Sequence, residues 1–425
     1  MIMQCQPARN DMNILLIHQY AGNKGDRAVL VALCHLLKCE FPDVRIAVST
    51  SNPLKWKADD LQEGDNVEFC PSGWDYQDAS SWRMWFCILD RLKKYTFTIL
   101  RFLQLHHIRF FTSSLMNPQF HEKLNDANIV LSVGGHHFTT LLSRDLVSGI
   151  NFDSMCVMAA NKPLVLFSQS FGPFVFHNEH NKNITKQLLN YCKSIYCREN
   201  KSVIELQLLG VNNQGIQQTS ETVLALNGVF DHRRELAARK KQIGIAIYST
   251  QKRTPDQLEH YCNVLAGFAK KAISDGFQVL FFPMELKGSA PDDRWLISKI
   301  LKLIDSSQAD YIDNDLPTVE HLRRVEECSL FVGHKTHSTI FALATGTPLI
   351  GICYHPKTRE FMKQFSCEEF AIDDDKLTAE ALETAYRKIS GRLEELSIRI
   401  FECARLAGKQ ISNDLRRAVL NSLQE

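Results

Sequence analysis

One unit near the C-terminus constrains the fold of this chain more than any other. The short apolar run Leu330–Val332 breaks at Gly333, and a helix-like apolar stretch then continues to Gly346. Pro348 opens a second apolar run, which ends at Cys353. In an open α/β sheet, the loop of such a strand-loop-helix-strand unit lies beyond the carboxyl end of its strand, where ligands bind. The pattern therefore predicts an α/β fold with a ligand site at this loop.

The side chains of this loop favour an anionic ligand. Lys335, His337 and Ser338 fall between the strand and the helix. A helix that begins near Ser338 directs free backbone N–H groups toward a bound anion. A lone histidine in a loop more often makes a local hydrogen bond, so Lys335 and the helix N-terminus are what favour a functional role for His337. A phosphate or a carboxylate is the expected ligand.

Composition excludes several classes of function. A chain of 425 residues is long enough for two domains, and its net charge of +1 provides no basic field for nucleic acid. The 13 cysteines include no CxxC pair, which favours reduced thiols in the cytoplasm over a disulfide framework or a zinc site. No apolar run approaches the length needed to cross a bilayer. We therefore expect a soluble, cytoplasmic protein.

A second ligand-facing loop is expected near the N-terminus. The predicted strand Ile14–Ile17 leads through a loop with two glycines, including Gly25, to a helix-like run from 28 to 37. Asp26 is placed to cap this helix, although Asn23 and Asp26 are equally placed to face an acceptor hydroxyl. The spacing is not GxGxxG, so a nicotinamide dinucleotide is not expected.

Paired glycines mark the end of another predicted strand, Ile129–Val133. Gly134 and Gly135 suit a ligand-facing turn, and His136 and His137 follow them. Adjacent side chains on a strand point to opposite faces, and no acidic partner follows at ligand spacing. A metal site is therefore not expected.

Arg198 occupies a comparable position after the predicted strand Ser194–Cys197. Arg198 directly precedes a helix-like run, so we expect it, like Lys335, in a loop beyond the carboxyl end of a strand. The alternative is a structural salt bridge to Glu199 or Glu205.

The segment from 82 to 111 differs from the rest of the chain. Between Arg83 and Arg109 it holds six Lys or Arg residues and one acidic residue, Asp90, with aromatic and aliphatic side chains between them. Such a segment can lie on an anionic membrane surface, here the inner face of the cell membrane. A partly buried helical insertion with solvated cations fits the pattern equally well.

A charged stretch without apolar periodicity, from 226 to 241, indicates the boundary between two domains. The first domain is expected to cover residues 1–225 and the second residues 242–425. The second begins with a predicted strand at 243–248, a helix at 255–274 and a strand at 279–282.

Together these pieces resemble the polysaccharide pyruvyl transferase family. The resemblance implies two Rossmann-like domains that face each other across a cleft, as in glycosyltransferases of the two-domain B type (GT-B), with phosphoenolpyruvate as the donor. The family usually has Arg where this chain has Lys335, which offers a point charge in place of a planar fork. The matching pieces are Gly22–Asp26, Gly134 with Gly135, Ser170–Pro173, Arg198 with Ser202, Gly333–Pro348, Tyr354 and Lys357.

The resemblance also implies roles for individual residues. His337 is expected to act as general acid or phosphate ligand, and Asp26 as a base near the acceptor. The implied acceptor is a saccharide, free or lipid-linked, and no metal or cofactor is needed. Two alternatives remain: a nucleotide-sugar glycosyltransferase of the same fold and a non-catalytic saccharide-binding protein. Donor binding is expected from Arg198, Lys335, Ser338 and Lys357, and the acceptor-side loops from Asn23, Gly134, Gly135 and Ser170.

Overall fold

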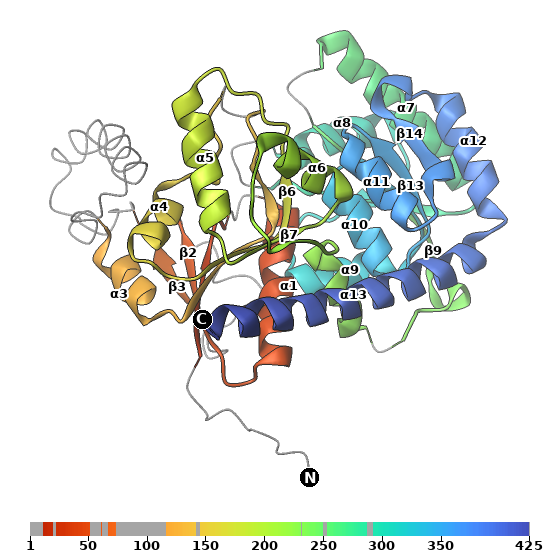
Figure 1. Cartoon of the computed structure of the whole chain (residues 1–425). Coiled ribbons are helices and arrows are strands. Elements are labelled where there is room, and N and C mark those ends of the chain that lie inside the picture. The colour runs from red at the N-terminus through yellow and green to blue at the C-terminus, as the bar shows by residue number, and fades with distance from the viewer. Residues whose placement is uncertain are drawn as a thin grey trace, which may run out of the picture.

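The computed structural model describes residues 12–19, 23–51, 61, 67–73, 116–141, 145–230, 232–249, 253–286 and 292–424. Two parallel sheets form two domains, and helices pack on the sheets in each domain (Figure 1). The predicted α/β fold with two Rossmann-like domains is confirmed. The predicted basic segment at 82–111 lies outside the described residues.

The N-terminal sheet is parallel throughout, and its central strands are almost wholly buried because both faces are covered. The order is β3-β2-β1-β4-β6-β7-β8, and β5 pairs with β6 off this path. The strands are β1 (Asn13–Ile17), β2 (Arg45–Thr50), β3 (Val67–Pro71), β4 (Ile129–Ser132), β5 (Gly135–Phe138), β6 (Leu164–Phe171), β7 (Ser194–Cys197) and β8 (Ile216–Gln218).

Capping residues mark several ends of the helices in this domain. Asn23 caps α1 by accepting a hydrogen bond from the Asp26 N–H at 2.9 Å. The prediction that Asp26 caps this helix is therefore wrong, because Asp26 lies inside the first turn. Gly210 ends α6 with a φ of 76°, a left-handed conformation that a residue without a Cβ atom adopts readily. The helices are α1 (Lys24–Glu40), α3 (Pro118–Asp126), α4 (Phe152–Ala159), α5 (Glu179–Tyr191) and α6 (Asn200–Leu209).

The C-terminal sheet has the strand order β11-β10-β9-β12-β13-β14, which is the 3-2-1-4-5-6 order of a Rossmann fold. Its strands are β9 (Lys240–Ala246), β10 (Gln278–Phe281), β11 (Ala309–Tyr311), β12 (Cys328–Gly333), β13 (Leu349–Cys353) and β14 (Ala371–Asp373). Its helices are α7 (Pro255–Ser274), α8 (Asp293–Ile304), α9 (Thr318–Glu326), α10 (Thr336–Ala344), α11 (Pro356–Gln364) and α12 (Ala379–Ser390). The predicted bounds of α7 and β13 agree with these.

The connection between the domains differs from the predicted charged link at 226–241. A 3-10 helix, η3 (Thr222–Val229), extends into this range and is largely buried, including Leu226. A second short 3-10 turn, η4 (Leu236–Ala238), precedes β9. The link without an apolar pattern is therefore shorter than predicted and begins after Val229.

The last helix, α13 (Leu393–Leu423), serves both domains. It runs from beneath the C-terminal domain to beneath the N-terminal domain (Figure 1). Thr219, just after β8, donates a hydrogen bond to Asp414 of α13 at 2.8 Å. The predicted assignment of all residues from 242 to 425 to the second domain therefore needs correction for the end of α13. Among the described residues, no helix is both long and apolar enough to cross a membrane.

Candidate active site

The loops that follow the central strands of the two sheets meet at the domain junction. In each sheet the chain order reverses beside the first strand, between β1 and β4 and between β9 and β12. Ligands of doubly wound folds bind outside the carboxyl ends of strands at such a point. The N–H of Lys24, at the start of α1, donates to the Met284 carbonyl of the other domain at 3.0 Å. The two switch points therefore face one another, which places the candidate site between them.

His337 of the C-terminal domain lies against Gly25 of the N-terminal domain. A Cβ atom placed on Gly25 would lie 2.1 Å from Nδ1 of His337, so this close approach requires glycine. Nε2 of His337 is buried and has no hydrogen-bond partner among the described residues. Burial, and then the charges of Arg198, Lys357 and Lys335, lower the pKa of His337 to about 3. The imidazole is therefore neutral at pH 7.

Lys357 is placed by the start of α11, where the ring of His355 accepts a hydrogen bond from the Lys357 N–H at 3.2 Å. Its Nζ atom is buried, and the described part of the chain offers it no hydrogen-bond partner. Burial, and then the Arg198 charge, lower the pKa of Lys357 to about 6. A buried amine without a hydrogen-bond partner is costly, and an anion beside it would both supply a partner and favour its charged form.

Arg198 is buried and held by its own domain. Its Nε donates to Ser170 Oγ at 2.6 Å, and its Nη1 pairs with Glu221. Glu199 lies 3.6 Å from the Arg198 Nε, so one of the two predicted salt bridges is present. Glu205 instead packs against Gly172, where it occupies the space that a Cβ atom on this glycine would need. The sequence did not point to Glu221, which has no local pattern to mark it. These contacts fix the guanidinium at the junction.

Lys335 is already paired within its domain. Its ammonium lies 3.2 Å from Asp293 and 3.4 Å from Glu285. Asp293 also accepts hydrogen bonds from the Met284 and Glu285 N–H groups at 2.9 and 2.8 Å, so it is fixed independently of Lys335. The positive charge at Lys335 is therefore largely neutralised before any donor binds. Its donor-binding role stays a prediction.

Ser338 is fully buried, and its hydroxyl donates to the Lys335 carbonyl at 2.7 Å. The helix begins at Thr336, two residues before the predicted start. Backbone N–H groups of the first turn, including that of His337, are therefore the groups nearest the loop. The Ser338 hydroxyl contributes to this turn.

Asp26 and Asn23 lie at the junction from the opposite side. The Asn23 side chain donates to Asp26 at 2.6 Å, and the Asn23 backbone pairs with Glu285 of the other domain. Burial raises the pKa of Asp26 to about 6, although the Asn23 hydrogen bond and the Arg198 charge act in the other direction. Such a carboxyl is a suitable base near neutral pH.

The glycine pair has a packing reason that the sequence did not reveal. A Cβ atom on Gly134 would lie 2.9 Å from the Ser168 carbonyl, and one on Gly135 would lie 2.4 Å from the His137 ring. His136 Nε2 donates to the Gly172 carbonyl at 2.6 Å. The glycines let the loop after β4 pack closely on β6, and their contact with an acceptor stays a prediction.

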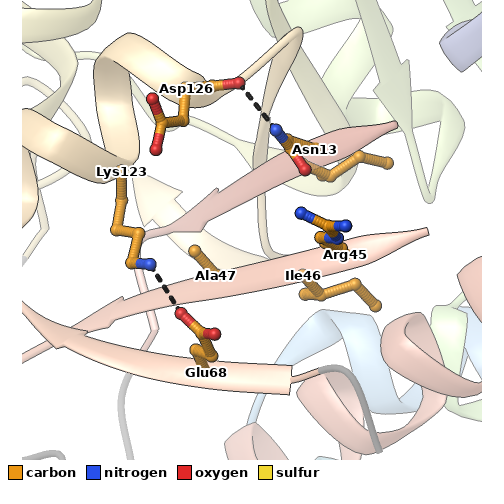
Figure 2. Close-up of a pocket in the computed structure, with 8 residues that line it drawn as sticks. Asn13, Arg45, Ile46, Ala47, Glu68, Lys123 and Asp126 are labelled. Atoms are coloured by element: carbon orange, nitrogen blue, oxygen red, sulfur yellow. Dashed lines mark hydrogen bonds and ion pairs between the residues drawn. The ribbon is translucent and has the colours of Figure 1, made fainter. Parts of the chain in front are cut away.

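A cavity of about 270 Å³ lies elsewhere, at the amino ends of β1, β2 and β3 (Figure 2). Lys123 pairs with Glu68 at 2.6 Å there, and the Asn13 side chain donates to the Asp126 carbonyl at 3.2 Å. This is the end of a parallel sheet opposite to the one that binds ligands, so we place the site at the domain junction instead.

Two Rossmann-like domains face each other, and in each of them the loops suited to bind ligands lie where the strand order reverses. This arrangement is the GT-B architecture. The chain belongs to the polysaccharide pyruvyl transferase family, whose model matches residues 23–356, which confirms the predicted resemblance. It is 23% identical to the amylovoran biosynthesis protein AmsJ of Erwinia amylovora, over 96% of this chain and 100% of that protein.

Solved structures with the same architecture support the fold alone, because their sequences are distant. The UDP-GlcNAc 2-epimerase of Neisseria meningitidis bound to UDP-GlcNAc has a TM-score of 0.55 at 10% identity, over 96% of this chain and 99% of that one. A UDP-glucose:anthocyanidin 3-O-glucosyltransferase in complex with UDP has a TM-score of 0.53 at 8% identity, with the same coverage. Chemistry must therefore be argued from the site.

Proposed function

We propose that this protein transfers pyruvate from phosphoenolpyruvate to a pair of hydroxyls on a saccharide and forms a pyruvate ketal in exopolysaccharide biosynthesis. The family and the similarity to AmsJ support this class of reaction. The observation that carries the donor assignment is the pair of buried nitrogens, Lys357 Nζ and His337 Nε2, without partners among the described residues. Both lie in the first turns of helices at the domain junction.

Phosphoenolpyruvate carries a phosphate and a carboxylate, and the junction offers groups for both. The first turns of α10 and α11 favour an anion through their free N–H groups and helix dipoles. Lys357 is assigned to one of the two anionic groups, and a bound anion raises its pKa and restores its charge. Arg198 is assigned to the other, although Ser170, Glu199 and Glu221 already engage two of its three guanidinium nitrogens. Lys335 contributes less because Asp293 and Glu285 already pair with it.

The reaction requires one proton donor and one proton acceptor. The first saccharide hydroxyl adds to C2 of phosphoenolpyruvate while its proton passes to Asp26, and His337 protonates the C3 methylene. The second hydroxyl then forms a bond to C2, the bond from C2 to the phosphate oxygen breaks, and the proton of this hydroxyl leaves with the phosphate. His337 can be the acid because the bound donor adds negative charge beside it and raises its pKa. No metal or cofactor takes part in this scheme.

The test is release of phosphate from phosphoenolpyruvate with a panel of free and lipid-linked saccharides. Lys357→Met should weaken the donor by about 1.5–3 kcal/mol, the usual range for a hydrogen bond to a charged group. Lys363→Met is the matched control, because Lys363 is exposed at the end of the same helix. Equal Michaelis constants for phosphoenolpyruvate in both variants would remove Lys357 from the donor site.

Turnover of nucleotide sugars in place of phosphoenolpyruvate would favour the glycosyltransferase alternative. Specific saccharide binding with no turnover of either donor would favour the non-catalytic one.

A lipid-linked acceptor would place the enzyme at the inner, cytoplasmic face of the cell membrane. The basic segment at 82–111 is then proposed to contact anionic lipid, and its binding should weaken with salt. Sedimentation with anionic liposomes at low and high salt measures this directly. Absence of the protein from the low-salt pellet would reject the membrane contact and leave pyruvyl transfer unaffected.

A further inference from the structure

A row of four aromatic rings crosses the domain junction beside the donor groups. Tyr248 follows β9 and Tyr354 follows β13, and their ring centroids lie 4.3 Å apart at an interplanar angle of 37°. The row continues to His355, 6.2 Å from Tyr354, and then to His136, 6.1 Å from His355. His136 belongs to β5 of the N-terminal domain, so the row joins the two domains. We call these residues, Tyr248, Tyr354, His355 and His136, the ring row.

The ring row is accessible, unlike the aromatic residues of the core. Tyr354 is 39% exposed although one side of its ring packs near Tyr248. The other three members are partly exposed. By contrast, phenylalanines such as Phe281 and Phe331 are fully buried beneath the sheets. Exposed aromatic rings at a ligand-binding edge are a feature of recognition surfaces more than of packing.

The histidines of the ring row are uncharged at neutral pH. Burial, and then the Lys357 charge, lower the pKa of His136 to about 3 and that of His355 to about 4. Neutral rings combine an apolar face with polar nitrogens at the edge. The Nε2 of His136 already donates to the Gly172 carbonyl, which fixes the orientation of that ring.

We propose that the ring row is the binding site for the saccharide acceptor, an assignment that rests on the proposed function. Sugar rings present apolar C–H faces, which pack on the electron-rich faces of aromatic side chains, while their hydroxyls bond to polar edges. A row that extends from one domain to the other matches a chain of sugars better than a single nucleobase, which needs only one stacking partner. Its neighbour Lys357 is the proposed donor ligand. The row therefore holds the acceptor alongside phosphoenolpyruvate.

The experiment measures saccharide binding without turnover, by saturation-transfer NMR. The probes are lactose, cellobiose and oligosaccharides prepared from amylovoran by mild acid hydrolysis. The wild-type protein should bind at least one probe, Tyr354→Leu should weaken that binding about three- to tenfold, and Tyr354→Phe should stay within about twofold. His136→Ala, from the opposite domain, should also weaken it. The control is Trp295→Leu, since Trp295 is an exposed ring that lies instead beside the Lys299 ammonium.

The outcomes separate this inference from the proposed function. Unchanged binding in both Tyr354→Leu and His136→Ala, or no binding of any probe, would overturn the ring row as an acceptor site. A loss of UDP binding in Tyr354→Leu, with saccharide binding unchanged, would assign the rings to a nucleobase. Saccharide binding that depends on the ring row in a protein that fails to bind phosphoenolpyruvate would retain the row and reject pyruvyl transfer. Thermal melting of each variant identifies any that fail to fold.

Discussion

At the residue scale, the contact between Gly25 and His337 decides whether the site is assembled. The histidine comes from one domain and the glycine from the other, and only the absence of a side chain at Gly25 admits the imidazole. The glycine therefore has a positioning role, which is separate from the flexibility expected of a glycine in a loop.

Gly25→Ala should lower kcat by about 100-fold, because a displacement of about 1 Å at a reacting group has effects of this size. The new Cβ atom would lie 2.1 Å from the His337 ring, so either the ring moves or the domains separate. Gly267→Ala is the control, since this glycine in α7 has no atom within 4 Å of an added Cβ. It should retain activity and gain about 0.5–1 kcal/mol of stability. Full activity in Gly25→Ala would show that His337 need not keep this position.

Asp26 and Lys357 predict a bell-shaped pH profile of kcat/KM centred near pH 6. Asp26, with a pKa of about 6, must lose its proton to act as base, so activity falls as the pH drops below this value. Lys357, with a pKa of about 6, must carry its charge to bind the donor, so kcat/KM falls as the pH rises above it. Asp26→Asn should remove the acidic limb along with most of the activity. Lys357→Met should move the alkaline limb without removing it, because His337 must also carry a proton to act as the acid. Steady-state kinetics from pH 5 to 8 test both, and an acidic limb that persists in Asp26→Asn or an alkaline limb that is unmoved in Lys357→Met contradicts the assignment.

At the scale of elements, α1 locks one domain to the other. Lys24 and Arg27 in its first turn are both buried and both pair with Asp315 of the C-terminal domain, with Arg27 Nη1 at 2.8 Å. The Lys24 side chain also donates to the Leu316 carbonyl. The buried cations of the N-terminal domain thus depend on a carboxylate of the C-terminal domain, because a buried charge without a partner is costly.

Asp315→Asn should lower the free energy of unfolding by about 1–2 kcal/mol, at the low end for charged hydrogen bonds because Asp315 is partly exposed. The two buried cations would lose the charge that balances them. Asp313→Asn is a matched control in the same loop, since the Asp313 side chain is 70% exposed and its pair with Arg294, at 3.4 Å, lies at the surface. Urea unfolding at pH 7 compares the two. Equal stabilities would show that the Asp315 pairs contribute nothing measurable.

At the scale of the whole molecule, one hydrophobic core extends through both domains. The larger of the two core clusters includes Leu16 of β1, Ile245 of β9 and Leu415 of α13. The smaller one, with residues such as Phe138 and Leu188, is confined to the N-terminal domain. The continuity indicates that the domains are stabilised together and unfold as a unit, with α13 as the element that joins them.

Leu415→Ala should lower the free energy of unfolding by about 2–5 kcal/mol, the range for a buried leucine cut to alanine. Leu415 is fully buried, whereas Leu406 on the same helix is 61% exposed. Leu406→Ala should therefore change stability by no more than about 0.5 kcal/mol. Denaturant unfolding monitored by two probes would show whether one transition persists. A separate early transition in Leu415→Ala would contradict unfolding as a unit.

Local patterns in the sequence were enough to predict several of the strands, the loops that follow them and the residues on those loops. Apolar runs with fixed periods specify buried strands and helices locally, so the ends of β7, β13 and α7 were predictable from their own residues. The same patterns placed Arg198, Lys335 and His337 at the carboxyl ends of strands, and the family resemblance added Lys357.

Which of these charged groups have partners within the protein became known only from the folded structure. Lys335 is paired with Glu285 and Asp293, 50 and 42 residues away, whereas Lys357 has no partner among the described residues. Such partnerships depend on strand order and on how the domains face each other, and no local period in the sequence encodes either. The same reason explains why the contact between Gly25 and His337 and the ring row became visible only after the two sheets were brought together.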